Sequence, residues 1–404
     1  MKLRLPAIVL LLICISFSVA INGTTMSRNA LFLAFIISLV DFYNIRLSAQ
    51  KDHFYYFMLV MSLLAGVMII HGMIFSSVSL AGTDEAYRFI AVKILMSGFI
   101  LYYLSQQGDR LSDTEISLAK CLVIVGFLYL SGQAIYLSSL NPGERLSIIT
   151  IPTTVAYVYS FQAFASIYII ASWKHKLKFV LLPLAVCLSF YVIFLTGTRS
   201  AILSFPFIII FYIVRKKFLS KKTLIGYSLI VLAVAVMINH KSFLNSLDRV
   251  ISTATEISDY KNNDGNTSLG ARFSLWKAGV VAFRYHHLGQ SSDQRYGEAK
   301  NYIDENEHQN PEALRVLGDH FHNDLIEATS LRGIEGMLVL ILFYLSLGCM
   351  LARFSENKDG AILLLLPLIV YGLTDVFFID FRNVTSLMMA LPIYLIFNRA
   401  YQCK

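Results

Sequence analysis

Residues 177–215 read LKFVLLPLAVCLSFYVIFLTGTRSAILSFPFIIIFYIVR. Two apolar runs, at 177–195 and 200–214, flank a short break at Gly197. About 20 apolar helical residues cross the roughly 30 Å hydrocarbon core of a bilayer, and glycine readily forms a sharp turn between two such helices. The stretch therefore predicts a tight pair of transmembrane helices, of which the second is short.

The composition of the whole chain agrees with a membrane location. Among 404 residues, 56% are hydrophobic and only 15% are charged, and the mean hydropathy is +0.62. Soluble domains carry about 25% charged residues. We therefore predict an all-α polytopic membrane protein with about 12 transmembrane helices. The twelve apolar runs lie near 4–21, 29–45, 54–76, 88–105, 118–140, 150–172, 177–195, 200–214, 223–239, 333–352, 360–377 and 384–398.

The positions of Lys and Arg predict the orientation, because basic residues are retained on the cytoplasmic side. With the N-terminus inside, the inner segments hold 17 basic residues and the short outer loops hold five, namely Arg28, Arg88, Arg145, Arg199 and Arg382. Both chain ends are therefore expected in the cytoplasm. The net charge of +8 reflects this asymmetry and does not imply nucleic acid. Residues 1–20 also have signal-peptide features, and their removal would leave every later helix in the same orientation.

Three segments follow from this topology: helices 1–9 in residues 1–239, a large periplasmic helical loop in residues 240–332, and helices 10–12 with a cytoplasmic C-terminus in residues 333–404. The loop holds ten basic and thirteen acidic residues. Bulk attraction therefore cannot recruit an anionic ligand, and specific arginines would have to hold a phosphate.

Within the loop, Ser268-Leu269-Gly270-Ala271-Arg272 begins an apolar helical pattern. Thr267 or Ser268 is a candidate N-cap, which places Arg272 in the first turns. We expect the apolar face of this helix to lie along the membrane surface. Residues 301–311 are typical of a mobile connector, and helical spacing returns at 312–317 and 321–331.

His322 stands where the polar loop runs into the tenth apolar run. It is either an interfacial or structural histidine, or a general base, since an imidazole with a pKa near 6.5 suits proton abstraction at neutral pH. Asn323 follows it directly, and Gly333 and Gly336 follow one helical stretch later. Small residues of this kind also permit close packing of membrane helices.

Three further charged residues lie near hydrocarbon, where an unpaired charge is costly. Arg199 is either a residue at a helix end or a functional cation. Asp375 is expected to pair with Arg199 or Arg382, or to take part in the chemistry directly. Lys93 has two interpretations, a structural ion pair or a contact with lipid phosphate.

A metal site is not predicted. Histidines are common zinc ligands, but on a helix His320 and His322 would point to different sides, and the loop has no HExxH or Asp-x-Asp pattern. The sequence also has no Walker loop and no dinucleotide fingerprint, so neither a metal nor a cofactor is expected.

Taken together, these residues resemble the O-antigen ligases of Gram-negative bacteria, within a wider group that includes O-antigen polymerases and protein O-oligosaccharyltransferases. The family pattern is His, then Asn, Ser or Gln, then nine residues, then Gly-x-x-Gly. Here it is met by His322, Asn323, Gly333 and Gly336. Thr198-Arg199, the 268–272 motif and the topology extend the resemblance over most of the chain, whereas the first 150 residues add little beyond hydropathy.

The resemblance implies a glycosyltransferase, similar to the membrane-embedded GT-C class, on the periplasmic face of the bacterial inner membrane. Its substrates would be O-antigen polysaccharide on undecaprenyl diphosphate and a sugar hydroxyl of lipid A-core, and membrane lipids would surround it. Transfer would be inverting, metal-independent and independent of ATP. His322 is then the expected base, Arg199 and Arg272 are expected to bind the diphosphate, and Asn323, Gly333, Gly336 and Asp375 are expected to support the site.

Two other functions are compatible with the sequence. An O-antigen polymerase needs the same arginines and base and differs in its acceptor, an undecaprenyl-linked glycan. A flippase or transporter would line a pathway with intramembrane charges, but the candidate charges gather at the outer mouth, and no inverted repeat is evident.

Overall fold

The computed structural model describes residues 4–44, 51–216, 240–262, 264–308, 310–354 and 359–402. Throughout these ranges the chain forms helices and turns, and it contains no β-strand. The predicted all-α polytopic class is confirmed. Seven of the helices within these ranges, α2 to α7 and α14, are long and apolar enough to cross a membrane, and α1 and Ala361–Thr374 are shorter apolar helices.

Eleven of the twelve predicted apolar runs coincide with helices, and the run at 223–239 lies outside the described residues. The bundle helices are α1 (Leu5–Ser18), α2 (Thr24–Asn44), α3 (His53–Ile74), α4 (Ala81–Gln107) with the 3₁₀ turn η1 (Gly108–Arg110), α5 (Asp113–Leu140), α6 (Pro152–Ala171), α7 (Lys178–Leu195), α8 (Arg199–Lys216), α14 (Asp324–Phe354), η2 (Ala361–Leu365) with α15 (Leu366–Thr374), and η3 (Phe377–Ile379) with α16 (Phe381–Gln402).

The quoted stretch forms α7 and α8, as predicted. The turn between them depends on Gly197, whose φ of +60° is a conformation that side chains with a Cβ rarely adopt. The Gly197 N–H donates to the carbonyl oxygen of Phe194 at 3.0 Å, which ends α7. Arg199 is the first residue of α8 and therefore lies at the mouth of the bundle.

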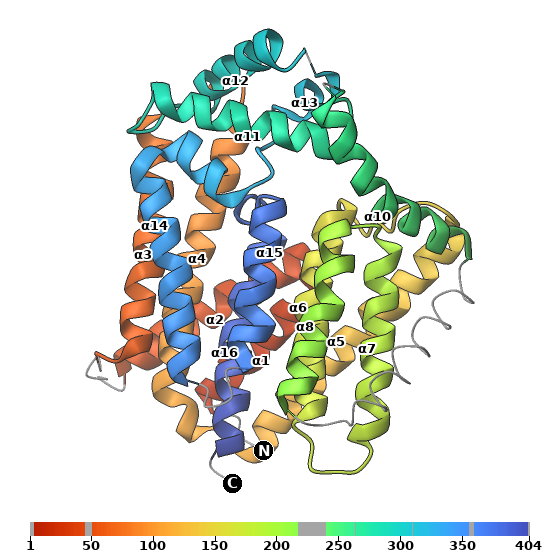
Figure 1. Ribbon diagram of the computed structural model, residues 1–404. Helices are drawn as coiled ribbons and strands as arrows, with labels where there is room; N and C mark the ends of the chain where they lie inside the picture. Colours follow the sequence, from red (N-terminus) through yellow and green to blue (C-terminus); the bar gives the residue numbers. More distant parts are fainter. Residues whose placement is uncertain are drawn as a thin grey trace.

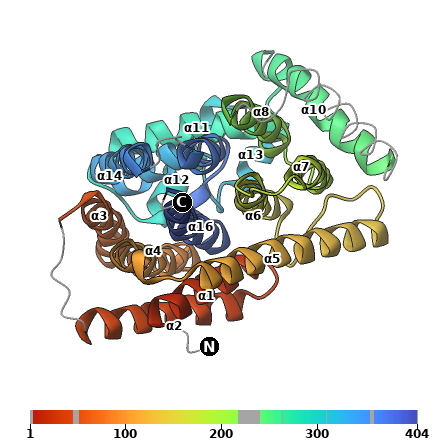
Figure 2. The same cartoon turned by 90° about the horizontal axis from the view of Figure 1, so that it is seen from below.

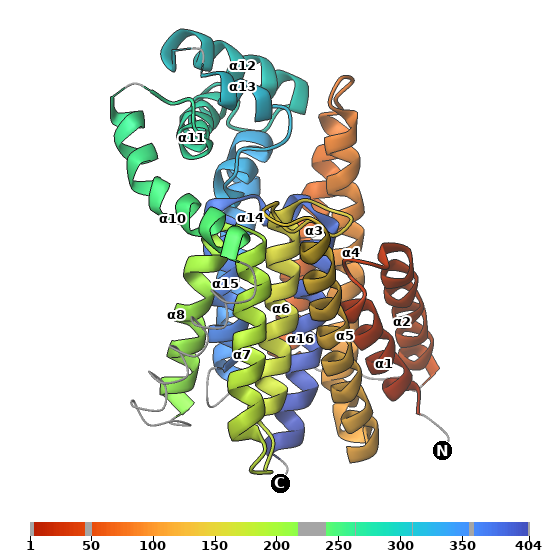
Figure 3. The ribbon, with the colours of Figure 1, turned by 90° about the vertical axis from the view of Figure 1, so that its right-hand side faces the viewer.

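Four helices lie outside the bundle: α10 (His240–Lys261), α11 (Ser268–Tyr285), α12 (Ser292–Asn306) and α13 (Pro311–Val316). Figure 1 shows α11 to α13 lying across one end of the bundle, and we call these three helices the cap. Figure 3 shows α10 slanting from the cap toward α7 and α8. The first residues of α1 and the last residues of α16 lie at the opposite end of the bundle (Figure 1).

The cap has a small hydrophobic core of its own, and this core corrects two expectations. Ala271, Leu275 and Ala278 of α11 are buried in it, so the apolar face of α11 is covered by protein instead of lying along a membrane. Residues 301–306, expected in a mobile connector, belong to α12. A capping box between Ser291 and Gln294 starts that helix, and Ile303 anchors its end in the core.

Candidate functional site

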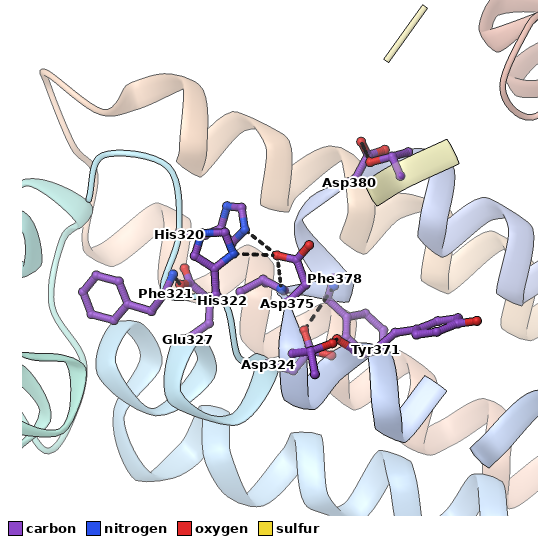
Figure 4. Close-up of polar contacts among 12 residues, drawn as sticks. His320, Phe321, His322, Asp324, Glu327, Tyr371, Asp375, Phe378 and Asp380 are labelled. Atoms are coloured by element: carbon purple, nitrogen blue, oxygen red, sulfur yellow. Dashed lines mark hydrogen bonds and ion pairs between the residues drawn. The ribbon is translucent and has the colours of Figure 1, made fainter. Parts of the chain in front are cut away.

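Two imidazoles share one carboxylate oxygen where the cap meets the bundle. The Nε2 atom of His320 lies 2.7 Å from Oδ1 of Asp375, and the Nδ1 atom of His322 lies 3.0 Å from the same oxygen. Figure 4 shows both rings pointing at Asp375, which follows the last residue of α15. The backbone N–H of Val376 donates to this oxygen as well, at 2.9 Å, which fixes the carboxylate.

Both histidines lie in the loop between α13 and α14, not on a helix. The expectation that their spacing separates them was therefore wrong. Asn323 is the reason, because its side-chain oxygen accepts hydrogen bonds from the backbone N–H groups of Leu325 and Ile326 and so caps α14 after His322. The Asn323 amide also donates to the carbonyl oxygen of Leu373 at 3.1 Å, which ties the loop to α15.

The ligand atoms of His320, His322 and Asp375 lie within 4.8 Å of one another. Two imidazoles and a carboxylate are also a donor set that transition metals accept. The absence of a metal therefore stays a prediction, but the spacing of His320 and His322 no longer supports it.

The backbone conformation of His322 helps to orient its ring toward Asp375. His322 has a φ of +50°, which is uncommon for a residue with a Cβ and turns the chain sharply before α14. Its carbonyl oxygen accepts a hydrogen bond from Nε1 of Trp276 on α11 at 3.3 Å. The loop is therefore held from the cap side by α11 and from the bundle side by Asp375.

The surroundings of the two histidines shift their pKa values in opposite directions. Burial lowers the pKa of His320, but the hydrogen bond and charge of Asp375 outweigh it, so this pKa is raised above its usual value. Burial and then the neighbouring His320 lower the pKa of His322, against the pull of Asp375. Burial also opposes ionisation of Asp375, yet the two histidines hold its pKa well below the usual range. At neutral pH, His322 is therefore the neutral imidazole.

Asp375 does not pair with Arg199 or Arg382, contrary to expectation. Arg382 pairs with Asp380 at 3.2 Å, and Arg199 forms an ion pair with Glu256 of α10. Arg199 also donates to Ser252 on the same helix at 3.2 Å. This pair therefore fixes α10 over the mouth of α8.

Arg199 belongs to a cluster of four arginines, with Arg145, Arg249 and Arg272. Desolvation and then the charges of Arg249, Arg272 and Arg199 lower the pKa of Arg145 to about 10. Desolvation, Arg199 and Arg272 likewise lower the pKa of Arg249, against the pull of Glu256. The cluster is therefore a strongly positive region that would stabilise a multiply charged anion.

Arg272 connects this cluster to the histidines. Thr267, one of the two predicted candidates, caps α11, and Arg272 lies one turn before Trp276 on the same face of the helix. Among the described residues, Arg272 has no hydrogen-bond or ion-pair partner. Its charge also contributes to the lowered pKa of His322. Arg272 is therefore a cation free to bind an anion, on the helix whose Trp276 holds the backbone of His322.

Residues 183–341 match the family model described as O-Antigen ligase. Over 291 residues the chain is 28% identical to the O-antigen ligase of Escherichia coli (strain K12), covering 70% of this chain and 67% of that protein. Over 160 residues it is 26% identical to an uncharacterized protein of Haemophilus influenzae, covering 38% of each. The chain is thus similar to O-antigen ligases over these residues.

The O-antigen ligase match runs from within α7 to within α14, and therefore includes Arg199, Arg272 and His322. Asp375 and Arg145 lie outside it. This similarity supports a membrane enzyme that processes glycans by ligase or polymerase chemistry.

The two glycines of the family pattern shape the backbone beside the site. Gly333 lies at a kink within α14, with φ +65° and ψ −154°. A Cβ there would collide with the carbonyl oxygen of His287, and a Cβ on Gly336 would collide with Arg332 and Ala328. Gly333 therefore lets the chain around His287 pack against α14, which is a structural role.

A buried ion pair, which the sequence analysis did not predict, supports the loop that carries His320 and His322. Glu327 accepts from Arg295 of α12 at 2.6 Å, from Tyr87 of α4 at 2.7 Å and from the backbone N–H of Phe321 at 2.9 Å. The guanidinium of Arg295 also lies 4.6 Å from the centre of the Phe321 ring. Glu327 thus connects the cap, the bundle and the residue between the two histidines.

Proposed function

We propose that this protein transfers O-antigen polysaccharide from undecaprenyl diphosphate to a sugar hydroxyl of lipid A-core. The reaction would take place on the periplasmic face of the bacterial inner membrane, where we expect the loop of residues 240–332, which includes α10 and the cap, with bundle segments before and after it. The observation that carries the proposal is the imidazole of His322, bonded through Nδ1 to Asp375 and held by Trp276 of α11, the helix that also carries Arg272.

His322 acts as the base in this proposal. With its Nδ1–H donating to Asp375, the lone pair of Nε2 remains for the acceptor hydroxyl. The acceptor oxygen attacks the anomeric carbon, its proton passes to Nε2, and the bond from the anomeric carbon to the phosphate oxygen breaks. Attack opposite the leaving group inverts the anomeric centre, by the logic of single displacement.

The arginines stabilise the leaving group. Undecaprenyl diphosphate gains negative charge as it departs, and guanidinium groups recognise phosphate through two parallel hydrogen bonds. Arg272 is free to bind it, and Arg199 is held in place by Glu256. Arg145 and Arg249 add charge to the same region. The energy of the diphosphate bond makes ATP unnecessary.

The experiment combines purified protein, undecaprenyl diphosphate-linked glycan and lipid A-core, in EDTA and without ATP. We expect ligated product. Elongated lipid-linked glycan in its place would favour a polymerase, translocation without bond formation would favour a transporter, and activity that EDTA abolishes would reject the metal-independent mechanism.

The base is tested by substitution of His322. His322→Ala is expected to abolish transfer while the protein stays folded and inserted. His322→Asn gives the same test with a side chain that tolerates positive φ. His308→Asn is the matched control, because His308 is an exposed cap histidine with a φ of +52°. Full activity of the His322 variants would reject the assignment.

A further inference from the structure

A cavity lies on another side of the bundle from the arginine cluster. It has a volume of about 430 Å³ and is lined by the first turns of α2, by α4 and by the segment that joins η3 to α16. Figure 2 shows α2 and α4 on one side of the bundle and α8 and α10 on the other. An occupant of this cavity would therefore reach the enzyme separately from a diphosphate at the arginine cluster.

Two cations line this cavity, Arg28 of α2 and Lys93 of α4. In the described part of the chain neither has a carboxylate within 4.0 Å, so the ion pair considered for Lys93 is not formed there. The Nζ atom of Lys93 donates to Thr385 at 3.2 Å and lies 4.2 Å from the centre of the Phe381 ring. The acid in the lining is Glu85, which is exposed. Asp380, which stands between Ile379 and Phe381 of the lining, also attracts Lys93, but it is paired with Arg382, so the two cations remain available to an anion.

The cavity also has an apolar side. Phe89 lines it and is 60% exposed. On α2, one turn beyond Arg28, Phe32 and Leu33 are 57% and 49% exposed. In a membrane protein such residues face lipid chains. Cations beside a lipid-facing apolar surface suit an amphiphile with an anionic headgroup.

Two of the segments that line the cavity are connected to the loop that carries His320 and His322. Ile379 and Phe381 follow Asp375 by four and six residues. On α4, Tyr87 lies two residues before Phe89 and bonds to Glu327, which in turn holds the backbone of Phe321. A headgroup held in the cavity would therefore lie beside the segments that position both histidines.

We propose that Arg28 and Lys93 bind a phosphate group on the headgroup of the acceptor glycolipid, while the arginine cluster holds the donor diphosphate. This inference rests on the proposed function, because it assigns the second of two amphiphiles that the reaction needs. Guanidinium and ammonium groups form charge-assisted hydrogen bonds with phosphate oxygens, and partial enclosure strengthens them.

The test measures binding alone, with no donor present. Purified protein in phosphatidylcholine nanodiscs is titrated with lipid A-core and with the same lipid after enzymatic removal of its phosphates. We expect the phosphorylated form to bind about tenfold tighter, as one or two charge-assisted contacts would give. The double variant R28Q/K93Q should lose this preference, and R28Q alone should lose part of it.

Two matched controls carry the same substitutions outside the cavity. Arg353 is an exposed arginine in the last turn of α14, and Lys120 is a half-buried lysine whose Nζ lies 5.4 Å from the ring centre of Phe397. R353Q and K120Q should keep the preference. Because Arg28 is exposed, R28Q should not impair folding, and equal unfolding temperatures would verify this.

Three results would overturn the proposal. The first is an unchanged preference in R28Q/K93Q. The second is competition by phosphatidylglycerol as strong as by phosphorylated acceptor, which would make the cavity a general site for anionic lipid. The third is equally tight binding of inorganic phosphate alone. If transfer activity is never found but the preference depends on Arg28 and Lys93, the proposed function fails and the binding site stands.

Discussion

The Nδ1 atom of His322 lies 3.0 Å from Oδ1 of Asp375, although the two residues are 53 positions apart in the chain. The same oxygen accepts from His320 at 2.7 Å. This arrangement selects one tautomer of His322 and leaves Nε2 for a substrate. It also places a second imidazole where it takes up positive charge, so that His322 stays neutral.

The first prediction concerns pH. A neutral His322 is required, so the rate of transfer should rise with pH as His322 loses its proton. The midpoint should lie below 6.5, because burial and then His320 lower the pKa of His322. The charged groups that act on His322 are His320, Asp375, Arg272 and Glu312. A pH–rate profile of single-turnover transfer measures this midpoint.

Two variants should move that midpoint in opposite directions. In Asp375→Asn the carboxylate that favours imidazolium is lost, so the midpoint moves to lower pH, and the plateau rate falls about 10²-fold or more. His320→Gln keeps a hydrogen-bond donor for Asp375 but removes the charge that repels a proton from His322, so the midpoint moves to higher pH. An identical midpoint in all three proteins would show that another group titrates.

Short stretches of sequence predicted much of this fold, because helices, turns and caps depend mainly on neighbouring residues. Hydropathy located eleven helices, Gly197 located the turn between α7 and α8, and Thr267 located the start of α11. Asn323, an N-cap residue directly before an apolar run, is a local signal that α14 begins after His322, whereas the helical spacing of residues 321–331 predicts an earlier start.

The rest depended on contacts between distant segments. Nothing near Asp375 in the sequence indicates that its partners are His320 and His322. Arg145 and Arg249 come from a loop and from α10, and only tertiary structure brings their charges together. The motif thus pointed to His322 as the proposed base and the sequence also named Asp375, whereas the contact between these two residues and the contribution of Arg145 and Arg249 required the structure.

The second prediction concerns the arginine cluster. Arg272→Ala should lower kcat/KM for the lipid-linked donor about 10²-fold to 10³-fold, the usual loss of one group that stabilises developing charge. Arg272→Lys should recover only part of this, because an ammonium cannot form the two parallel bonds of a guanidinium. Arg145→Ala should mainly raise the KM for the donor. Arg284→Ala is the control, an exposed arginine at the other end of α11. Equal losses from Arg284→Ala and Arg272→Ala would contradict a specific role.

The third prediction concerns stability. The side chains of Arg295 and Glu327 are 3% and 1% exposed, so Glu327→Ala leaves a guanidinium buried without its partner. Loss of one partner in such a pair costs about 3–5 kcal/mol. Thermal unfolding in detergent should show a clear drop in midpoint, with early exposure of the cap to protease. Asp304→Ala, which breaks the exposed pair with Lys300, should leave the midpoint nearly unchanged. A stable Glu327→Ala protein would mean that the cap does not depend on this pair.

The fourth prediction separates packing from chemistry in the family pattern. Gly333→Ala should lower the yield of folded protein, because alanine fits neither the φ of +65° nor the space beside the His287 carbonyl. Gly66→Ala in α3 is the matched control, since a Cβ there meets no atom within 4 Å. Fluorescence-detected size-exclusion chromatography measures the folded fraction of both. Since Gly333 touches no reacting group, the surviving Gly333→Ala protein should keep the wild-type pH midpoint. A shifted midpoint with normal yield would instead place Gly333 in the chemistry.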